Sequence, residues 1–133
     1  MGAIVLDSSI VIGLFNPTDA LHPLSAQAIR SARAVSREIV IPTSVVAETL
    51  VAVARHGDER LAHRREQLRT AFGLPEPLTE EIAVAAARLR ARHGSLRLPD
   101  ALVIATAQVL DASQVLTGDH RWHGIDPRVR VLG

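Results

Sequence analysis

The sequence of 133 residues contains no cysteine, no lysine and no tyrosine, and each absence excludes a kind of chemistry. Without cysteine there is no disulfide, no thiolate zinc site and no thiol nucleophile. Without lysine there is no P-loop lysine and no Schiff-base chemistry of the kind that pyridoxal phosphate enzymes use. The remaining chemistry must come from carboxylates, hydroxyls, histidine and arginine.

Aromatic side chains and long apolar runs are also scarce. The only aromatic residues besides histidine are Phe15, Phe72 and Trp122, too few to stack successive bases of a single-stranded nucleic acid. No apolar run approaches the roughly 18 residues of a membrane span. The N-terminal segment has no positive charge before its apolar stretch, unlike a signal peptide. We therefore expect a cytoplasmic protein without a membrane partner.

Charge is nearly balanced overall, with 15 basic and 14 acidic residues, so attraction to nucleic acid must come from local patches. One such patch lies in residues 88–97, which hold four arginines and no acid. Arg88 and Arg92 share a helix face there, which makes them candidate RNA-binding residues. The ordinary alternative is a solvated helix face.

The length suits one domain over residues 1–133, and the apolar pattern alternates short runs with helical periods. Four segments read as strands: Ala3–Leu6, Glu38–Ile41, Gln114–Thr117 and Val129–Leu132. A further short strand is expected between Pro75 and Pro77. Helices are predicted over Ile10–Phe15, His22–Val35, Thr43–Arg55, Asp58–Phe72, Thr79–His93 and Pro99–Leu110. This order predicts an α/β fold with a mostly parallel sheet flanked by helices.

Two acids follow predicted strands directly. Asp7 ends the first strand, and Asp119 comes just after the strand Gln114–Thr117. The carboxyl ends of parallel strands meet at one edge of a sheet, so the two carboxylates are expected to converge. Taken singly, Asp7 also reads as a helix N-cap and Asp119 as part of a turn with Gly118.

Two further acids lie in apolar helices. Glu48 has Val45, Val51 and Ala52 on its own helix face, where an unpaired charge is costly. Asp100 follows Pro99 in a first helical turn, where the helix dipole alone would account for an acid. Carboxylates brought together repel one another unless a cation intervenes. With only oxygen ligands on offer, Mg²⁺ is the natural cation, with Mn²⁺ as a substitute, and such a site suits phosphodiester hydrolysis.

At these residues the chain resembles the PIN-domain ribonucleases, and among them the VapC-type toxins of bacterial toxin–antitoxin pairs. The resemblance covers essentially the whole chain. Its four motifs are Ile4-Val5-Leu6-Asp7-Ser8-Ser9, Val45-Val46-Ala47-Glu48, Leu98-Pro99-Asp100-Ala101-Leu102-Val103-Ile104-Ala105-Thr106-Ala107 and Leu116-Thr117-Gly118-Asp119-His120-Arg121-Trp122. Each motif is weak alone, whereas four in order are fairly specific.

The resemblance implies a three-layer α/β fold and a Mg²⁺-dependent endoribonuclease. Its catalytic acids would be Asp7, Glu48, Asp100 and Asp119. Asp7, Asp100 and Asp119 would hold the metal, and Glu48 would hold a water at the metal or a second ion. Ser8 and Thr117 would support these ligands by hydrogen bonds. The implied partners are RNA, a small antitoxin and a second copy of the chain.

Other interpretations fit less well. A haloacid dehalogenase-type phosphatase needs an aspartate where Ser9 stands, and it needs a lysine, as a receiver domain also does. A non-catalytic PIN-like binding domain would be expected to have lost some of the four acids. A stand-alone RNA-processing nuclease stays open, as does the RNA that is cleaved. His120 and His123 read as surface-loop residues, and the catalytic set does not include them.

Overall fold

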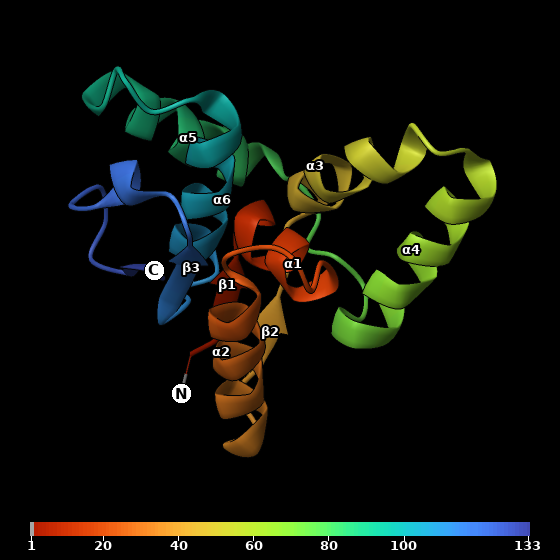
Figure 1. Cartoon of the computed structure of the whole chain (residues 1–133). Helices are drawn as coiled ribbons and strands as arrows, with labels where there is room; N and C mark the ends of the chain where they lie inside the picture. Colours follow the sequence, from red (N-terminus) through yellow and green to blue (C-terminus); the bar gives the residue numbers. More distant parts are fainter. Residues whose placement is uncertain (1) are drawn as a thin grey trace.

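The computed structural model describes residues 2–133, which form a small parallel sheet and six helices. Figure 1 shows the elements with their labels. In chain order they are β1 (Ile4–Leu6), α1 (Ser8–Phe15), α2 (His22–Ala34), β2 (Ile39–Val40), α3 (Thr43–Ala54), α4 (Asp58–Phe72), α5 (Glu80–Arg92), α6 (Leu98–Val109), β3 (Gln114–Thr117), a 3₁₀ turn η1 (His120–Trp122) and β4 (Val129–Val131).

The four strands are all parallel and lie in the order β2-β1-β3-β4. In β1, Val5 pairs with Val40 of β2 on one side and with Val115 of β3 on the other. All three residues of β1 are buried, as expected for a central strand covered on both faces. The short apolar runs of the sequence are therefore strands because both of their faces lie in the core.

Helices cover the sheet and give the three-layer α/β architecture. Helix α6 packs against β1 and β3, and α5 packs along α6. Helix α1 contacts β3 and α3, and α2 packs against α1. Figure 1 shows α3 and α4 as a helical hairpin that extends away from the sheet. No helix within residues 2–133 is long and apolar enough to span a bilayer.

Helix α6 is the most buried helix of the chain. Asp100, Ala101 and the run 103–107 are all buried, so α6 is apolar around most of its circumference. Its first residues are Leu98 and Pro99, and proline is well accommodated there because the first N–H groups of a helix have no partner. A rigid central helix of this kind holds Asp100 in a fixed position beside the sheet.

The predicted order of strands and helices is confirmed, with one correction. The segment between Pro75 and Pro77 is no strand; only Glu76 forms an isolated parallel bridge, with Pro42. The Glu76 N–H donates to Ile41 O at 2.9 Å and its carbonyl accepts from Thr43 N at 2.9 Å. Both prolines lack an N–H, so the ladder cannot extend beyond this residue.

Candidate functional site

Asp7 lies at the carboxyl end of β1, and its carboxylate is almost fully enclosed. It caps α1 by accepting a hydrogen bond from Ser8 N at 2.8 Å. Its other oxygen accepts from Ser9 Oγ at 2.8 Å and from Thr117 Oγ1 at 2.7 Å. Burial raises the pKa of Asp7, the three hydrogen bonds oppose that rise, and the negative charge of Asp100 adds to it.

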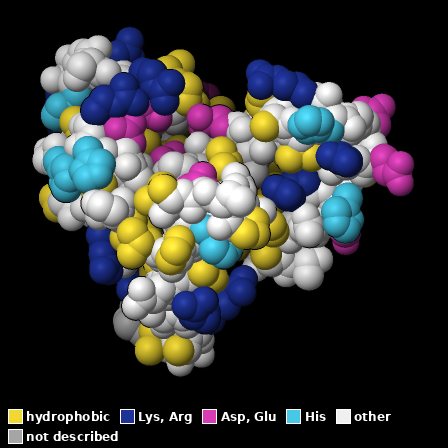
Figure 2. Space-filling model, in the orientation of Figure 1, with side chains coloured by type: hydrophobic (Ala, Val, Ile, Leu, Met, Phe, Trp, Pro, Cys, Tyr) yellow, Lys and Arg dark blue, Asp and Glu magenta, His cyan; other side chains and the backbone are white. Residues whose placement is uncertain are grey.

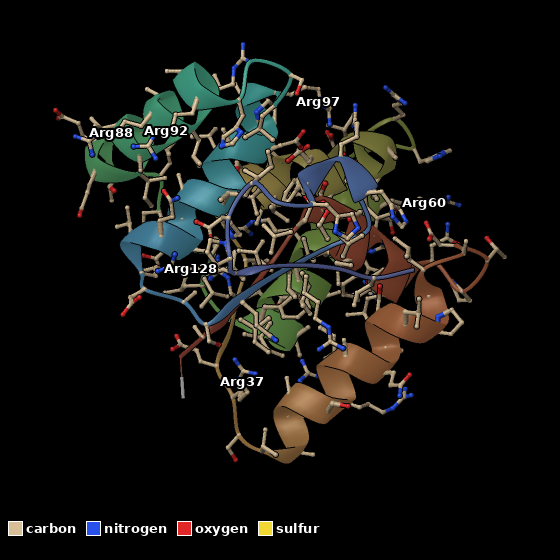
Figure 3. All side chains as sticks on the ribbon, turned by 90° about the vertical axis from the view of Figure 1, so that its left-hand side faces the viewer. Arg37, Arg60, Arg88, Arg92, Arg97 and Arg128 are labelled. Atoms are coloured by element: carbon tan, nitrogen blue, oxygen red, sulfur yellow. The ribbon has the colours of Figure 1, made fainter. Side chains whose placement is uncertain are left out.

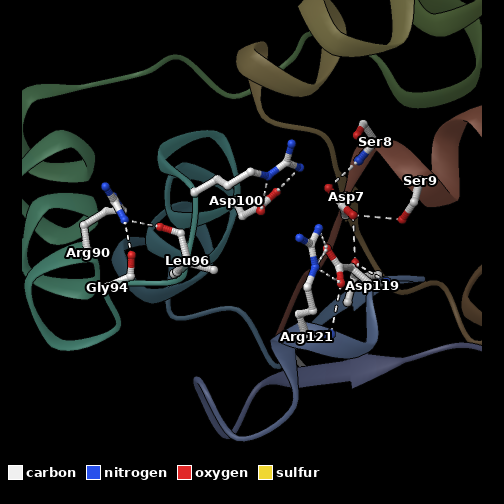
Figure 4. A network of polar contacts seen from close by, with 11 residues as sticks. Asp7, Ser8, Ser9, Arg90, Gly94, Leu96, Asp100, Asp119 and Arg121 are labelled. Carbon is white, nitrogen blue, oxygen red and sulfur yellow. Dashed lines mark hydrogen bonds and ion pairs between the residues drawn. The ribbon is translucent and has the colours of Figure 1, made fainter.

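The same hydroxyls connect β1 to the end of β3. Thr117 Oγ1 accepts from Asp119 N at 3.0 Å, and Ser9 Oγ accepts from Gly118 N at 2.9 Å. Each hydroxyl thus donates to Asp7 and accepts from the backbone that follows β3. This small network fixes the position of Asp119 relative to Asp7, as the parallel sheet led us to expect (Figure 4).

Asp119 is paired with an arginine two residues further along the chain. Its carboxylate caps η1 by accepting from Arg121 N at 2.9 Å, and it also accepts from the Arg121 guanidinium, at 2.7 Å from Nη2 and 3.0 Å from Nε. These contacts lower the pKa of Asp119, chiefly through the guanidinium hydrogen bonds. Figure 4 shows Arg121 lying against Asp119.

Asp100 has an arginine partner of the same kind. It lies in the first turn of α6 and accepts from Arg97 Nε at 3.1 Å and Nη2 at 3.4 Å. Arg97 precedes the helix and is exposed, whereas Asp100 is buried. The negative charge of Asp100 is therefore close both to the N-terminus of α6 and to a guanidinium.

Glu48, on α3, has no partner of this kind. Its Oε1 is buried and makes no hydrogen bond within the described residues. Burial raises the pKa of Glu48, and the negative charges of Asp7 and Asp100 raise it further. An orphaned, partly desolvated carboxylate oxygen beside two other carboxylates needs a proton or a cation.

The four acids thus share one region, reached from β1, α3, α6 and the end of β3. Figure 2 shows acidic side chains in the hollow between the α5–α6 side of the molecule and the α3–α4 arm, with basic side chains beside them. Asp100 and Asp119 line the same pocket of about 270 Å³, whose other lining residues are Ser95, Leu96, Arg121, Trp122 and Ile125.

The donor chemistry of this region fits a hard divalent cation. Carboxylates are the ligands that Mg²⁺ and Mn²⁺ prefer, and Glu48 has a buried oxygen without a partner. Within residues 2–133, no three acidic or histidine side chains are drawn together closely enough to form a ready metal site. In the observed geometry Arg97 and Arg121 hold Asp100 and Asp119, as counter-ions of these acids.

Other residues singled out in the sequence lie elsewhere or contribute differently. Arg88 and Arg92 are exposed on α5, apart from Arg97 (Figure 3). Ser8 contacts Asp7 through its backbone N–H, whereas the hydroxyl that reaches Asp7 from this turn belongs to Ser9. The sequence analysis did not single out Ser9, Arg97 or Arg121, although Arg97 stands three residues before Asp100 and Arg121 two residues after Asp119.

Solved structures with a similar fold come from toxin–antitoxin systems. A chain in a toxin–antitoxin complex from Klebsiella pneumoniae is 25% identical, with a TM-score of 0.76 and 97% of each chain covered. A chain of VapBC2 from Rickettsia felis, bound to a promoter DNA fragment, has a TM-score of 0.78 at 14% identity, covering 98% of this chain and 99% of that one. VapC20 from Mycobacterium tuberculosis, described as a sarcin–ricin loop cleaving toxin, has a TM-score of 0.69 at 20% identity, covering 92% and 95%.

At their identities of 14% and 20%, the second and third of these structures establish the fold alone. No curated protein matches the sequence. The model of the PIN domain family matches residues 4–126, which include all four acids. Because that match spans nearly the whole chain, this protein belongs to the PIN domain family.

Proposed function

We propose that the chain is a divalent-metal-dependent endoribonuclease and the toxin of a toxin–antitoxin pair. The observation that carries the proposal is that Asp7, Glu48, Asp100 and Asp119 come from four separate elements of a PIN fold and lie near one another. Within residues 2–133, Asp7 and Glu48 have no ion-pair partner. The 25% identical chain from a Klebsiella pneumoniae toxin–antitoxin complex supports the partner class. The cleaving activity described for the Mycobacterium tuberculosis neighbour supports the reaction class.

Asp7, Asp100 and Asp119 are the residues that would hold Mg²⁺ or Mn²⁺. When bound, the cation would polarise the scissile phosphate and acidify an attacking water. Thr117 and Ser9 fix the orientation of the Asp7 carboxylate through the hydrogen bonds described above. They oppose the rise in the pKa of Asp7 that burial causes, because each donates to the charged form.

Glu48 is the residue we assign to proton transfer. Its Oε1 has no hydrogen-bond partner, so it is free to accept a proton from water. Its pKa is raised by burial and by the neighbouring acids, which makes it a stronger base than an exposed glutamate. Glu48 thus differs in role from the other three acids: it handles a proton or orients a water.

The experiment is cleavage of a 5′-labelled RNA with end-group analysis. We expect products with a 5′-phosphate and a 3′-hydroxyl, because attack by water needs no ribose 2′-OH. EDTA should abolish cleavage, and excess Mg²⁺ or Mn²⁺ should restore it. Asp58→Asn, an exposed acid on α4, is the matched control and should cleave like the wild type. Cyclic phosphate ends formed in EDTA would contradict the mechanism.

Two alternatives give different results in that experiment. A non-catalytic PIN-like RNA-binding domain would bind the RNA, with Arg88 and Arg92 as candidate contacts, and leave it intact. A stand-alone processing nuclease would cleave, but its expression would not arrest growth in a way that an adjacent small gene relieves. The toxin assignment predicts such relief by an antitoxin, together with a homodimeric toxin acting in the cytoplasm.

A further inference from the structure

Arg97 and Arg121 differ from the other ion-paired or structural arginines in what they bind. Arg90 donates to the carbonyls of Gly94 at 2.9 Å and Leu96 at 2.5 Å, and so fixes the turn between α5 and α6. Arg128 likewise donates to Ala112 O at 2.9 Å. The guanidiniums of Arg97 and Arg121 donate to no backbone carbonyl within the described residues; their only partners are Asp100 and Asp119.

Breaking either of these two ion pairs requires little free energy. The arginine side chains are 60% and 71% exposed, whereas the carboxylates they cover are 9% and 20% exposed. An ion pair with so exposed a partner changes an equilibrium by a factor of only about five or less. Each guanidinium can therefore move into solvent once another cation takes its place beside the largely buried carboxylate.

The two guanidiniums lie near each other. The positive charge of Arg121 acts on Arg97, and that of Arg97 acts on Asp119, so the two pairs are near neighbours although they come from α6 and η1. Arg121 also lines the pocket that Asp100 and Asp119 share. Figure 4 shows Asp100, Asp119 and Arg121 in one view with Asp7. If both arginines left their carboxylates, they would offer two neighbouring positive charges to an anionic ligand that binds at this site.

We propose that Arg97 and Arg121 are exchangeable counter-ions of the acidic site. Each holds its carboxylate until a divalent cation replaces it, and each then binds a phosphate group of the RNA. The planar guanidinium matches both partners, because carboxylate and phosphate accept the same two parallel N–H bonds. This inference rests on the proposed function, since it takes the metal and the RNA from it.

The first test is calorimetric titration of Mn²⁺ into the RNA-free protein. We expect Arg97→Gln and Arg121→Gln each to tighten Mn²⁺ binding about two- to fivefold, because the competing cation is gone. The double variant should tighten it further. Arg30→Gln, on the exposed face of α2, removes the same charge away from these contacts and should leave the affinity unchanged.

The second test observes the guanidiniums directly. The Nε–Hε resonances of Arg97 and Arg121, assigned from the two variants, should shift when Mg²⁺ is added, whereas those of Arg90 and Arg128 should not. Adenosine 5′-monophosphate, which has no phosphodiester bond to cleave, should then shift the same two resonances in saturating Mg²⁺. Each variant should bind this nucleotide about two- to fivefold more weakly than the wild type.

The outcomes separate this inference from the proposed function. If the wild type binds Mn²⁺ and both variants bind it with unchanged or lower affinity, the counter-ion role is wrong while the metal site stands. If neither the wild type nor the double variant binds Mn²⁺, the metal site and the counter-ion role fail together. Binding by the double variant alone would support exchange, with the arginines as the dominant competitors.

Discussion

The four acids of the site form two pairs that differ in what surrounds their negative charges. Within residues 2–133, neither Asp7 nor Glu48 accepts a hydrogen bond from a guanidinium. Asp7 accepts from two hydroxyls and a backbone N–H, and one oxygen of Glu48 has no partner. Asp100 and Asp119 each receive a charged arginine from their own segment. Accordingly the pKa of Asp7 and of Glu48 is raised, and that of Asp119 is lowered.

The difference separates a fixed part of the site from an exchangeable part. The donors to Asp7 come from Ser8, Ser9 and Thr117, which are set by the N-terminus of α1 and the end of β3, so they cannot move without the backbone. The guanidinium donors to Asp100 and Asp119 lie on long, exposed side chains, and only Arg121 N, which also donates to Asp119, belongs to the backbone. A cation that binds at the site would therefore be the first positive charge in contact with Asp7 and Glu48. At Asp100 and Asp119 it would have to replace an arginine.

The largest effect should appear in cleavage. We expect Asp7→Asn to lose on the order of a thousandfold in rate, because a metal ligand contributes several kcal/mol of charge stabilisation. Asp119→Asn should lose about 10- to 100-fold, a smaller loss, because Arg121 is released at the same time and remains able to bind phosphate. Single-turnover cleavage of one RNA by both variants measures the ratio. Equal losses would remove the distinction between the two pairs of acids.

An intermediate effect should follow from the buried hydroxyl of Thr117. Thr117→Val keeps the shape but removes the donor to Asp7 and the acceptor of Asp119 N–H. We expect the variant to be about 1–3 kcal/mol less stable at pH 7, because Asp7 loses one of its three donors and the Asp119 N–H loses its acceptor. Urea unfolding in EDTA measures this, with Thr117→Ser as the control that retains both hydrogen bonds. A Thr117→Val protein as stable as Thr117→Ser would show that the hydroxyl contributes no net stability.

The sequence predicted the fold and the convergence of Asp7 with Asp119 because both depend on backbone topology. In a parallel sheet the carboxyl ends of neighbouring strands lie at the same edge, so acids that follow those strands must lie near one another. The interpretations of Asp7 as a helix cap and as a site residue turned out to be compatible: the same carboxylate caps α1 and faces the acids. Glu48 lies partly buried near two other acids, but its predicted apolar face is only partly confirmed: Val45 is buried, whereas Val51 and Ala52 are exposed.

What sequence reasoning missed depends on side-chain conformation. Arg97 and Asp100 have the i, i+3 spacing of a helical ion pair, but the four arginines of residues 88–97 looked alike in the sequence. In the structure Arg90 fixes a turn, Arg97 holds Asp100, and Arg88 and Arg92 are exposed on α5. Likewise Ser9, and not Ser8, reaches Asp7 with its hydroxyl, because α1 begins at Ser8 and the helix turn directs the next side chain back to its cap.

The smallest expected effect is on the stability of the fold, and its sign should differ between a variant of Asp7 and a variant of Asp119. In EDTA at pH 7 we expect Asp7→Asn to stabilise the fold by about 1 kcal/mol, because it removes a buried charge whose pKa is raised. Such a carboxyl costs stability as the pH rises from its unfolded pKa to its folded one, so the gain should shrink as the pH falls toward the unfolded pKa of about 4 and vanish well below it. Asparagine can still accept from Ser8 N, and the hydroxyls of Ser9 and Thr117 can turn to accept from its amide.

Asp119→Asn should do the reverse, by less than about 1 kcal/mol, since its partner Arg121 is exposed and screened by solvent. The pKa of Asp119 is lowered, so its stabilising contribution is present above the unfolded pKa and is lost only as the pH falls through the lower folded value. At pH 4, therefore, the stability gain of the Asp7 variant should be much smaller than at pH 7, while the Asp119 variant should still be less stable than the wild type. Urea unfolding of the three proteins at pH 7 and pH 4 measures both differences. Two variants that shift in the same direction at pH 7 would mean that burial, and not the choice of counter-ion, governs both carboxylates.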